Sequence, residues 1–149
     1  MTDLDSALRA TRALLAIVAR SLAPVLEEVT LPQFRVLVLL ETRGPTRVGK
    51  LAEQLDVVQS TFSRVLDRLE AAGWVSRAAS SDSRREVLVS ISPRGSRLVQ
   101  DVSAKRQAEL DRVLDAVPAD ERSRIVDALG AFADAAGEPA ASELLVLGM

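Results

Sequence analysis

One face of the helix predicted over residues 58–72 carries side chains that form hydrogen bonds or bear positive charge. They are Gln59, Ser60, Thr61, Ser63, Arg64 and Arg68. Amide, hydroxyl and guanidinium groups at helical spacing can bind the base edges of duplex DNA, and arginine can bind guanine or phosphate. The alternative for the two arginines is an ion pair with Asp67 or Glu70 on the surface of the same helix.

A second group of cations flanks this helix in the sequence. Arg84 and Arg85 stand side by side within SSDSRREVLVSIS, residues 80–92, where a polar stretch gives way to alternating apolar residues. Both are candidates for DNA contacts, and a solvated hairpin tip is the alternative. Three further cations are candidates for phosphate contacts: Arg47, Lys50 and Arg77. For Arg77, at the base of the hairpin, a structural role is the alternative.

The residue types that the chain lacks restrict its chemistry. It contains no cysteine and no histidine, which excludes disulfides, cysteine nucleophiles, Ser-His-Asp triads and zinc sites of the usual kind. The sequence offers no nucleophile–base pair, no cofactor-binding loop and no carboxylate cluster with metal-loop spacing. We therefore expect neither an enzyme nor a protein that holds a cofactor or a metal. A switch by thiol oxidation is excluded, and a histidine switch near neutral pH is not expected.

Charge is distributed unevenly along the 149 residues, whose formal net charge is −2. Residues 43–97 carry a net charge of +4, whereas residues 1–42 and 98–149 carry −1 and −5. A basic middle between acidic ends is typical of a nucleic-acid-binding module joined to a separate scaffold.

The apolar residues indicate a helical core and no membrane segment. The chain is 48% hydrophobic but only 3% aromatic, so its core must consist mainly of Leu, Val and Ala. No apolar run approaches the ~18 residues that cross a bilayer. The N-terminus also lacks the basic start and apolar centre of a signal peptide. We therefore expect a cytoplasmic protein.

Periodicity predicts a mainly α fold with one small β-hairpin. Helices are predicted over residues 3–23, from Thr30 through QFRVLVLLE, over 48–55 and 58–72, from about 94 to 117, and from about 118 onwards. After Gly73 the apolar period changes from 3.6 to 2, so WVSRAA and EVLVSIS are predicted to form the hairpin. A short helix, a tight turn at Asp56, a second helix and this hairpin together indicate a winged helix-turn-helix.

Three stretches carry a resemblance to the MarR family of bacterial transcription regulators: LPQFRVLVLLETRGPTRVGKLAEQL, STFSRVLDRLEAAGWVSR and RREVLVSISPRG. The resemblance covers roughly residues 4–136. It implies a winged helix-turn-helix lobe over residues 30–93, and a helical dimerisation body made of residues 1–29 and 94–149. It implies a homodimer that binds palindromic double-stranded DNA, most often as a repressor that a small lipophilic or aromatic ligand releases.

The same resemblance assigns roles to individual elements. The helix matching Val58–Ala72 is expected to enter the major groove, and Arg85 is expected to enter the flanking minor groove. Arg84 is expected at the DNA backbone beside it. The chain departs from the family pattern at three positions: Ser83 replaces an aspartate of the wing, Asp56 replaces a glycine of the turn, and Val58 replaces a small polar N-cap. The sequence leaves open whether Asp82 takes over the role of that aspartate.

Two further alternatives concern partners. An apolar seam that includes Leu4, Leu8 and Leu15 favours a partner chain, with burial inside the same chain as the alternative. An effector pocket would draw on Leu15, Phe34 and Val38, which the sequence favours as ordinary core residues. Trp74 is likewise expected in the core. The rival function is a winged-helix dimer that contacts proteins and binds no DNA.

Overall fold

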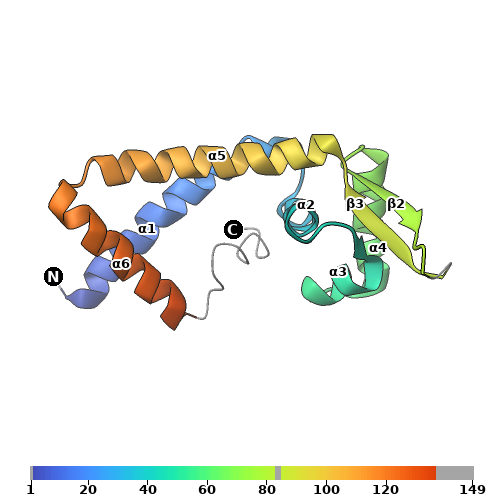
Figure 1. Cartoon of the computed structure of the whole chain (residues 1–149), viewed down its shortest axis with the longest axis horizontal. Coiled ribbons are helices and arrows are strands. Elements are labelled where there is room, and N and C mark those ends of the chain that lie inside the picture. Colours follow the sequence, from blue (N-terminus) through green and yellow to red (C-terminus); the bar gives the residue numbers. More distant parts are fainter. Residues whose placement is uncertain (1, 83–84, 137–149) are drawn as a thin grey trace. The chain divides into compact units, whose positions relative to one another are not determined.

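The computed structural model describes residues 2–82 and 85–136, and its elements are mostly helices (Figure 1). The helices are α1 (Asp3–Leu22), a 3-10 turn η1 (Val25–Glu27), α2 (Leu31–Arg43), α3 (Val48–Gln54), α4 (Gln59–Ala71), α5 (Pro93–Asp115) and α6 (Ala119–Ala135). The strands are β1 (Thr46–Arg47), β2 (Val75–Ala79) and β3 (Val87–Ile91). The predicted fold class, mainly α with a small β wing, is confirmed.

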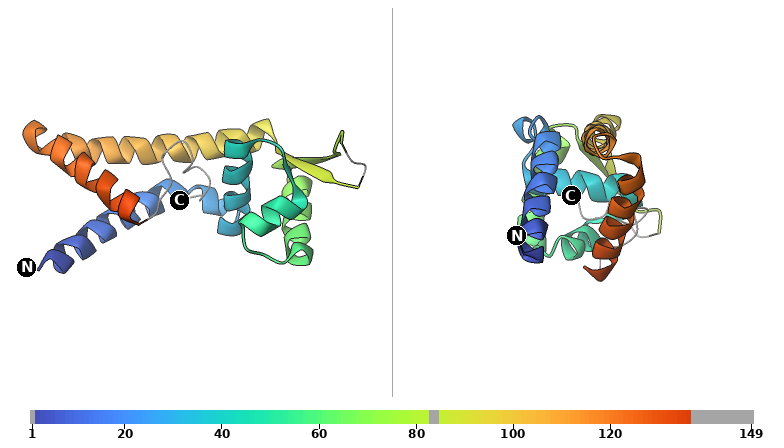
Figure 2. Two further views of the ribbon diagram at one scale, coloured as in Figure 1. Left: turned by 60° about the horizontal axis from the view of Figure 1, so that its bottom comes forward. Right: turned by 90° about the vertical axis from the view of Figure 1, so that its left-hand side faces the viewer.

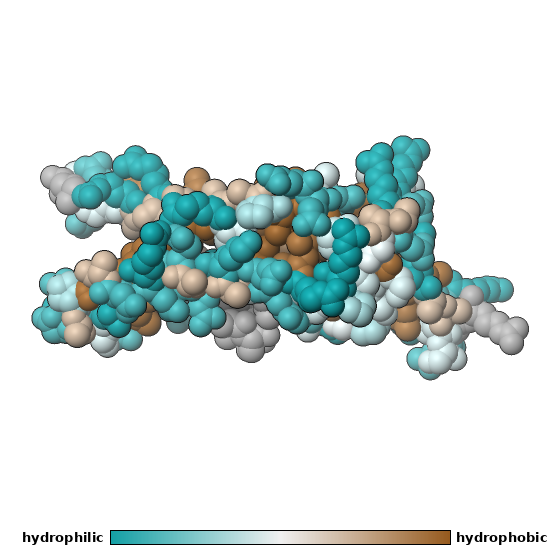
Figure 3. Space-filling view, turned by 90° about the horizontal axis from the view of Figure 1, so that it is seen from above, coloured by the Kyte–Doolittle hydropathy of each residue, from teal (hydrophilic) through white to brown (hydrophobic). Residues whose placement is uncertain are grey.

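The described chain divides into two compact units. The helical unit contains the residues up to Glu28 and those from Asp101 onwards, and the winged unit contains residues 29–100. None of the described helices is long and apolar enough to cross a membrane. Hydrophilic residues predominate on the molecular face in Figure 3, with apolar residues between them.

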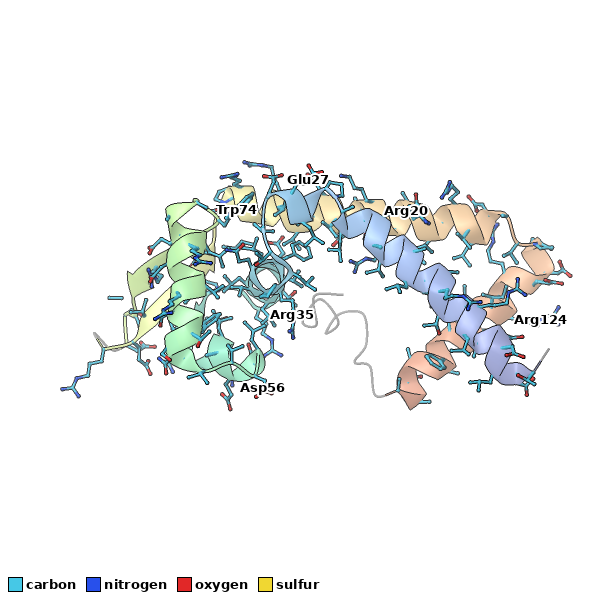
Figure 4. The ribbon with its side chains drawn as sticks, turned by 180° about the vertical axis from the view of Figure 1, so that it is seen from behind. Arg20, Glu27, Arg35, Asp56, Trp74 and Arg124 are labelled. Carbon is cyan, nitrogen blue, oxygen red and sulfur yellow. The ribbon has the colours of Figure 1, made fainter. Side chains whose placement is uncertain are left out.

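Within the helical unit, polar contacts join α1 to α5. The Nη2 atom of Arg20 lies 2.9 Å from Oε2 of Glu109, and Nε of Arg106 donates to Oγ of Ser21 at 3.3 Å (Figure 4). The Arg20 guanidinium lowers the pKa of the Glu109 carboxyl. Many apolar side chains of this unit remain exposed: Leu4, Leu8, Leu14, Leu15, Val113, Ile125, Val126, Leu129 and Phe132.

Helix α2 supplies the centre of the winged unit, and its sequence fixes where it begins. The Thr30 hydroxyl accepts from the backbone N–H of Gln33, whose side-chain oxygen accepts from the N–H of Thr30 in return. This capping box satisfies two N–H groups that the helix itself leaves without partners. Phe34 and Val38 are buried in the core, as the sequence favours, whereas Leu15 in the helical unit is 64% exposed.

The turn between α3 and α4 depends on Asp56, which has a φ of 52° in the left-handed region. Its N–H donates to the Glu53 carbonyl at 3.1 Å, and the next N–H, of Val57, donates to the Ala52 carbonyl at 3.0 Å. These two bonds form a Schellman motif, which normally places glycine at the left-handed position. Asp56 therefore substitutes for the usual glycine without a change of turn geometry.

Replacing Asp56 with glycine should stabilise the winged unit. The left-handed conformation strains most residues with a Cβ atom, and relief of that strain should raise the free energy of unfolding by about 0.5–1 kcal/mol. Urea denaturation of the wild type, Asp56→Gly and Asp56→Ala measures the effect. The alanine variant should be the least stable of the three, and a glycine variant less stable than the wild type would contradict this account.

The sheet has three antiparallel strands in the order β1-β3-β2. The hairpin pairs Val75 with Ile91 and Ala79 with Val87, and β1 pairs Arg47 with Leu88 on the other edge of β3. The hairpin agrees with the prediction, but β1 is an addition to it. Figure 2 shows the hairpin projecting beyond the helices of the winged unit.

Close backbone packing fixes the start of α5 against the end of α4. The Ser92 hydroxyl accepts from the N–H of Gly95 and donates to the Gly73 carbonyl, and the Ser92 N–H donates to the Trp74 carbonyl. The Arg94 guanidinium stacks 3.7 Å above the centre of the Trp74 ring and donates to the carbonyl of Ala72. Trp74 is 4% exposed, so its predicted place in the core is confirmed.

Candidate nucleic-acid interface

Helix α4 has one buried face and one exposed face. Phe62, Leu66 and Leu69 are buried at spacings of four and three, which anchors one side of the helix in the winged unit. Val58, which precedes the helix as its N-cap, is 71% exposed. Most of the opposite face of α4 is therefore exposed, except on the side that contacts β2.

All the candidate residues of α4 are exposed except Ser63. Exposed are Gln59, Ser60, Thr61, Arg64 and Arg68. Ser63 is half-buried and its hydroxyl donates to the Gln59 carbonyl at 3.0 Å, so its proton is already used within the helix. Within the part of the chain that the structure describes, no side chain pairs with Arg64 or Arg68.

The carboxylates that the sequence offers to Arg64 and Arg68 are taken by Arg77 of β2. Its Nη2 lies 2.6 Å from Oδ1 of Asp67 and 2.6 Å from Oε2 of Glu70, which also accepts from Nε at 2.8 Å. Glu70 first, and Asp67 second, hold the pKa of the Arg77 guanidinium above its ordinary value. Arg77 thus joins the wing to α4, which is the structural role given above as its alternative.

Replacing Arg77 with glutamine should lower the free energy of unfolding by up to about 1 kcal/mol, because partly exposed ion pairs contribute little individually. Arg64→Gln is the matched control, since it removes the same charge from α4 without breaking a described ion pair, and should leave stability unchanged. Urea denaturation of both variants measures the difference. Equal stability of the two variants would exclude a structural contribution from Arg77.

A concave surface, here called the wing groove, lies between the wing and the N-terminal parts of α3 and α4, with a volume of about 860 Å³. Its polar lining brings together side chains far apart in the sequence: Arg47, Lys50, Glu53, Gln59, Ser63, Arg77, Arg85 and Glu86. Four of these eight are cations and two are carboxylates. The groove therefore combines hydrogen-bonding groups with a cationic excess, which suits a polyanionic partner.

The cations of the wing groove differ in their surroundings. Lys50 is exposed, and no described side chain pairs with it. Arg47 is also exposed, but its Nε lies 2.7 Å from Oε2 of Glu86, the residue immediately before β3. Sequence reasoning missed Glu86, because it stands beside Arg85 on a segment whose long-range register with β1 was not predicted.

The tip of the wing is described only in part. Arg85 is exposed and lines the wing groove, whereas Arg84 and Ser83 lie outside the described residues. The Asp82 N–H donates to the Ser80 hydroxyl at 3.3 Å. The role of Asp82 towards Arg85 stays an open prediction.

The N-terminus of α4 has no side-chain cap, as expected from the presence of valine at position 58. Val58 caps the helix by its backbone alone, with no hydrogen bond from its side chain. The N–H groups of Gln59, Ser60 and Thr61 precede the first hydrogen bond within the helix, which runs from the N–H of Phe62 to the Val58 carbonyl. Such N–H groups favour a negatively charged partner.

Comparison with known proteins agrees with this fold. Residues 29–87 match the sequence profile of the MarR family. The structure of RV1404 from Mycobacterium tuberculosis is 41% identical, with a TM-score of 0.83, and the alignment covers 91% of this chain and 92% of that protein.

Two curated relatives are more distant. The multiple antibiotic resistance protein MarR of Salmonella typhimurium is 30% identical over 58% of this chain and 60% of its own length. The HTH-type transcriptional repressor MdtR of Bacillus subtilis is 29% identical over 72% of this chain and 70% of its own length. The chain spans less than two thirds of the length of several curated relatives that it matches.

Proposed function

Because the chain belongs to the MarR family, we propose that it is a homodimeric transcriptional regulator that binds double-stranded DNA of a preferred, palindromic sequence. The fold is that of winged-helix regulators, and relatives at about 30% identity carry the names of a transcriptional repressor and of a multiple antibiotic resistance protein. Repression, followed by release on binding a small lipophilic or aromatic ligand, is the mode of action that we propose.

The observation that carries this proposal is the exposed face of α4. Gln59, Ser60 and Arg64 project from a helix whose opposite face is anchored in the core, and the arginine has no described ion-pair partner. A guanidinium group at that position can donate two hydrogen bonds to the guanine edge in the major groove. Arg47 and Lys50 of the wing groove would then contact phosphates that flank the major groove.

Arg85 completes the proposed interface. It lies on the wing, close to the start of β3, and a narrow minor groove attracts an inserted arginine because its negative potential is enhanced. We propose that Arg84 contacts the DNA backbone beside this minor groove. Two copies of this interface, spaced by a dimer, would read half-sites about one helical turn apart.

The experiment that tests the proposal is a binding titration with duplex fragments from the region upstream of the protein's own gene. An arbitrary duplex of equal length serves as the reference. The preferred fragment should bind more tightly than the reference, and affinity should fall by about 0.9 log unit per log unit of salt for each phosphate contact. Equal, micromolar and salt-insensitive binding to every fragment would favour a dimer that contacts proteins instead.

The exposed apolar residues of the helical unit support the dimer. A set of this size, including Phe132 at 71% exposure, would be costly to leave in water. We propose that residues 1–29 and 94–149, the segments that the resemblance assigns to the dimerisation body, form the dimer interface; the helical unit lies within them.

Replacing Phe132 with aspartate should dissociate the dimer. An aromatic residue near the centre of an interface contributes about 2 kcal/mol, so the dimer Kd should rise by about 30-fold or more. Sedimentation over a range of protein concentrations measures Kd. Leu31→Asp, which places the same charge at an exposed apolar residue of the winged unit, should leave Kd unchanged, and an unchanged Kd in Phe132→Asp would exclude Phe132 from the centre of the interface.

The proposed release by a ligand follows from differential binding. A small molecule that prefers a spacing of the two DNA-binding lobes unsuited to DNA would lower DNA affinity by the ratio of its affinities for the two states. Since the chain has neither cysteine nor histidine, such a ligand is a better candidate signal than thiol oxidation or a change of pH near neutrality.

A further inference from the structure

Arg47 and Glu86 form an ion pair inside the wing groove, within the surface proposed to face DNA. The distance from Nε of Arg47 to Oε2 of Glu86 is 2.7 Å, and the two side chains are 51% and 41% exposed. Both residues line the groove together with Arg85 and Lys50. A carboxylate therefore lies among the cations that would contact phosphate.

The backbone of the sheet holds Glu86 in this place. Arg47 pairs with Leu88 across the β1–β3 ladder, and side chains two residues apart on a strand point to the same face. Glu86 consequently lies diagonally opposite Arg47 on one face of the sheet. The Ser80 N–H also donates to the Glu86 carbonyl at 2.8 Å, which extends the hairpin ladder beyond the end of β2 and the start of β3.

Because the Arg47–Glu86 pair is exposed to water, we expect it to affect DNA binding more than folding stability. Ion pairs open to water contribute little to folding stability, since both charges are well solvated when apart. The same pair matters much more when a phosphate approaches, because Arg47 can then bind the phosphate only by giving up Glu86. If Glu86 stays, two negative charges share one guanidinium group.

We propose that Glu86 competes with DNA phosphate for Arg47 and thereby limits sequence-independent binding to duplex DNA. This inference rests on the proposed function. Non-specific binding comes almost entirely from phosphate contacts, so a paired Arg47 lowers it directly. A preferred sequence gains base contacts through α4 in addition, so with Glu86 in place those base contacts supply a larger share of its affinity.

A purely structural role for the pair would have the opposite effect on DNA affinity. If Glu86 mainly held the wing in position, its loss would misplace Arg85 and weaken DNA binding. The hairpin, however, is already held by five residue pairs between β2 and β3 and by the bond from Ser80. We therefore expect the loss of competition to outweigh any loosening of the wing.

The test uses the full chain and a duplex of arbitrary sequence about three helical turns long. Glu86→Gln keeps the shape of the side chain and removes its charge. Its affinity at low salt should exceed that of the wild type by about five- to tenfold, and the salt slope should steepen by about 0.9, the value of one additional phosphate contact. Unchanged affinity and slope, or weaker binding, would overturn the inference.

Two controls separate competition for Arg47 from a general effect of charge. Glu53→Gln removes a carboxylate of the same groove that has no described ion-pair partner; it should raise affinity less and leave the slope unchanged. In an Arg47→Gln background, Glu86→Gln should also lose most of its effect on the slope, because the two changes act through one contact. An equal gain in that background would overturn the inference.

A different comparison of affinities tests the proposed function. Preference for an upstream fragment over the arbitrary duplex tests whether the protein is a sequence-specific regulator, and the Glu86 comparison uses the arbitrary duplex alone. If neither the wild type nor Glu86→Gln binds any duplex, both the proposed function and this inference are wrong.

Discussion

Arg64→Ala is expected to weaken binding to the preferred duplex by about 10- to 100-fold, because a bidentate contact to a base contributes about 1–3 kcal/mol of discrimination. The preference at one base-pair position should relax as well. Arg64 suits this role since it is exposed on α4, one turn after the helix begins, and pairs with no described side chain.

Competition binding with duplexes that carry single base-pair changes measures both effects. Lys50→Ala gives the contrasting pattern, a loss of affinity that is similar for all sequences and a salt slope smaller by about 1. Arg124→Ala removes an equal charge from α6 in the helical unit and should change neither quantity. A uniform loss in Arg64→Ala, without relaxed preference, would place Arg64 at a phosphate and not at a base.

Gly95→Ala should have the largest effect on stability. A Cβ atom at Gly95 would lie 2.7 Å from the Trp74 carbonyl oxygen and 2.8 Å from Cγ1 of Ile91. The carbonyl belongs to the backbone and accepts from the Ser92 N–H, so it cannot move aside without loss of that bond. Overpacking of this kind costs about 1–3 kcal/mol of the free energy of unfolding.

Urea denaturation followed by the fluorescence of Trp74, the only tryptophan, reports on the site itself. Gly49→Ala is the matched control because a Cβ atom there meets nothing within 4 Å. That variant should be as stable as the wild type or gain up to about 1 kcal/mol, since alanine favours the helix. If both alanine variants unfold at the same urea concentration, the close approach at Gly95 carries no strain.

Local signals in the sequence predicted the ends of the helices. Thr30, Gly73 and Ser92 each act within about four residues of their own position, through caps or a left-handed turn. The apolar period likewise predicted both strands of the hairpin. The fold class could therefore be predicted from residues that are close together in the chain.

Contacts between distant segments could not be predicted in the same way. Strand β1 has only two residues and depends on its pairing with β3, so it leaves no periodic pattern. The sequence offered Asp67 and Glu70 to arginines of their own helix, yet the structure pairs them with Arg77 of β2. Which candidate cations are committed to the protein, and which remain for a partner, depends on this tertiary geometry.

Helix α4 lies between two Schellman motifs: the one at Asp56 precedes it, and a second follows it, in which the Gly73 N–H donates to the Glu70 carbonyl and the Trp74 N–H to the Leu69 carbonyl. Asp56, labelled in Figure 4, precedes the helix and Gly73 follows it. Both residues are in the left-handed region, so the length of the segment is fixed at both ends. One inserted residue would rotate the outer face by about 100°. A preference for a new DNA sequence should therefore arise, in evolution or by engineering, from substitutions at the exposed positions of α4 alone. The buried residues Phe62, Leu66 and Leu69 would stay unchanged.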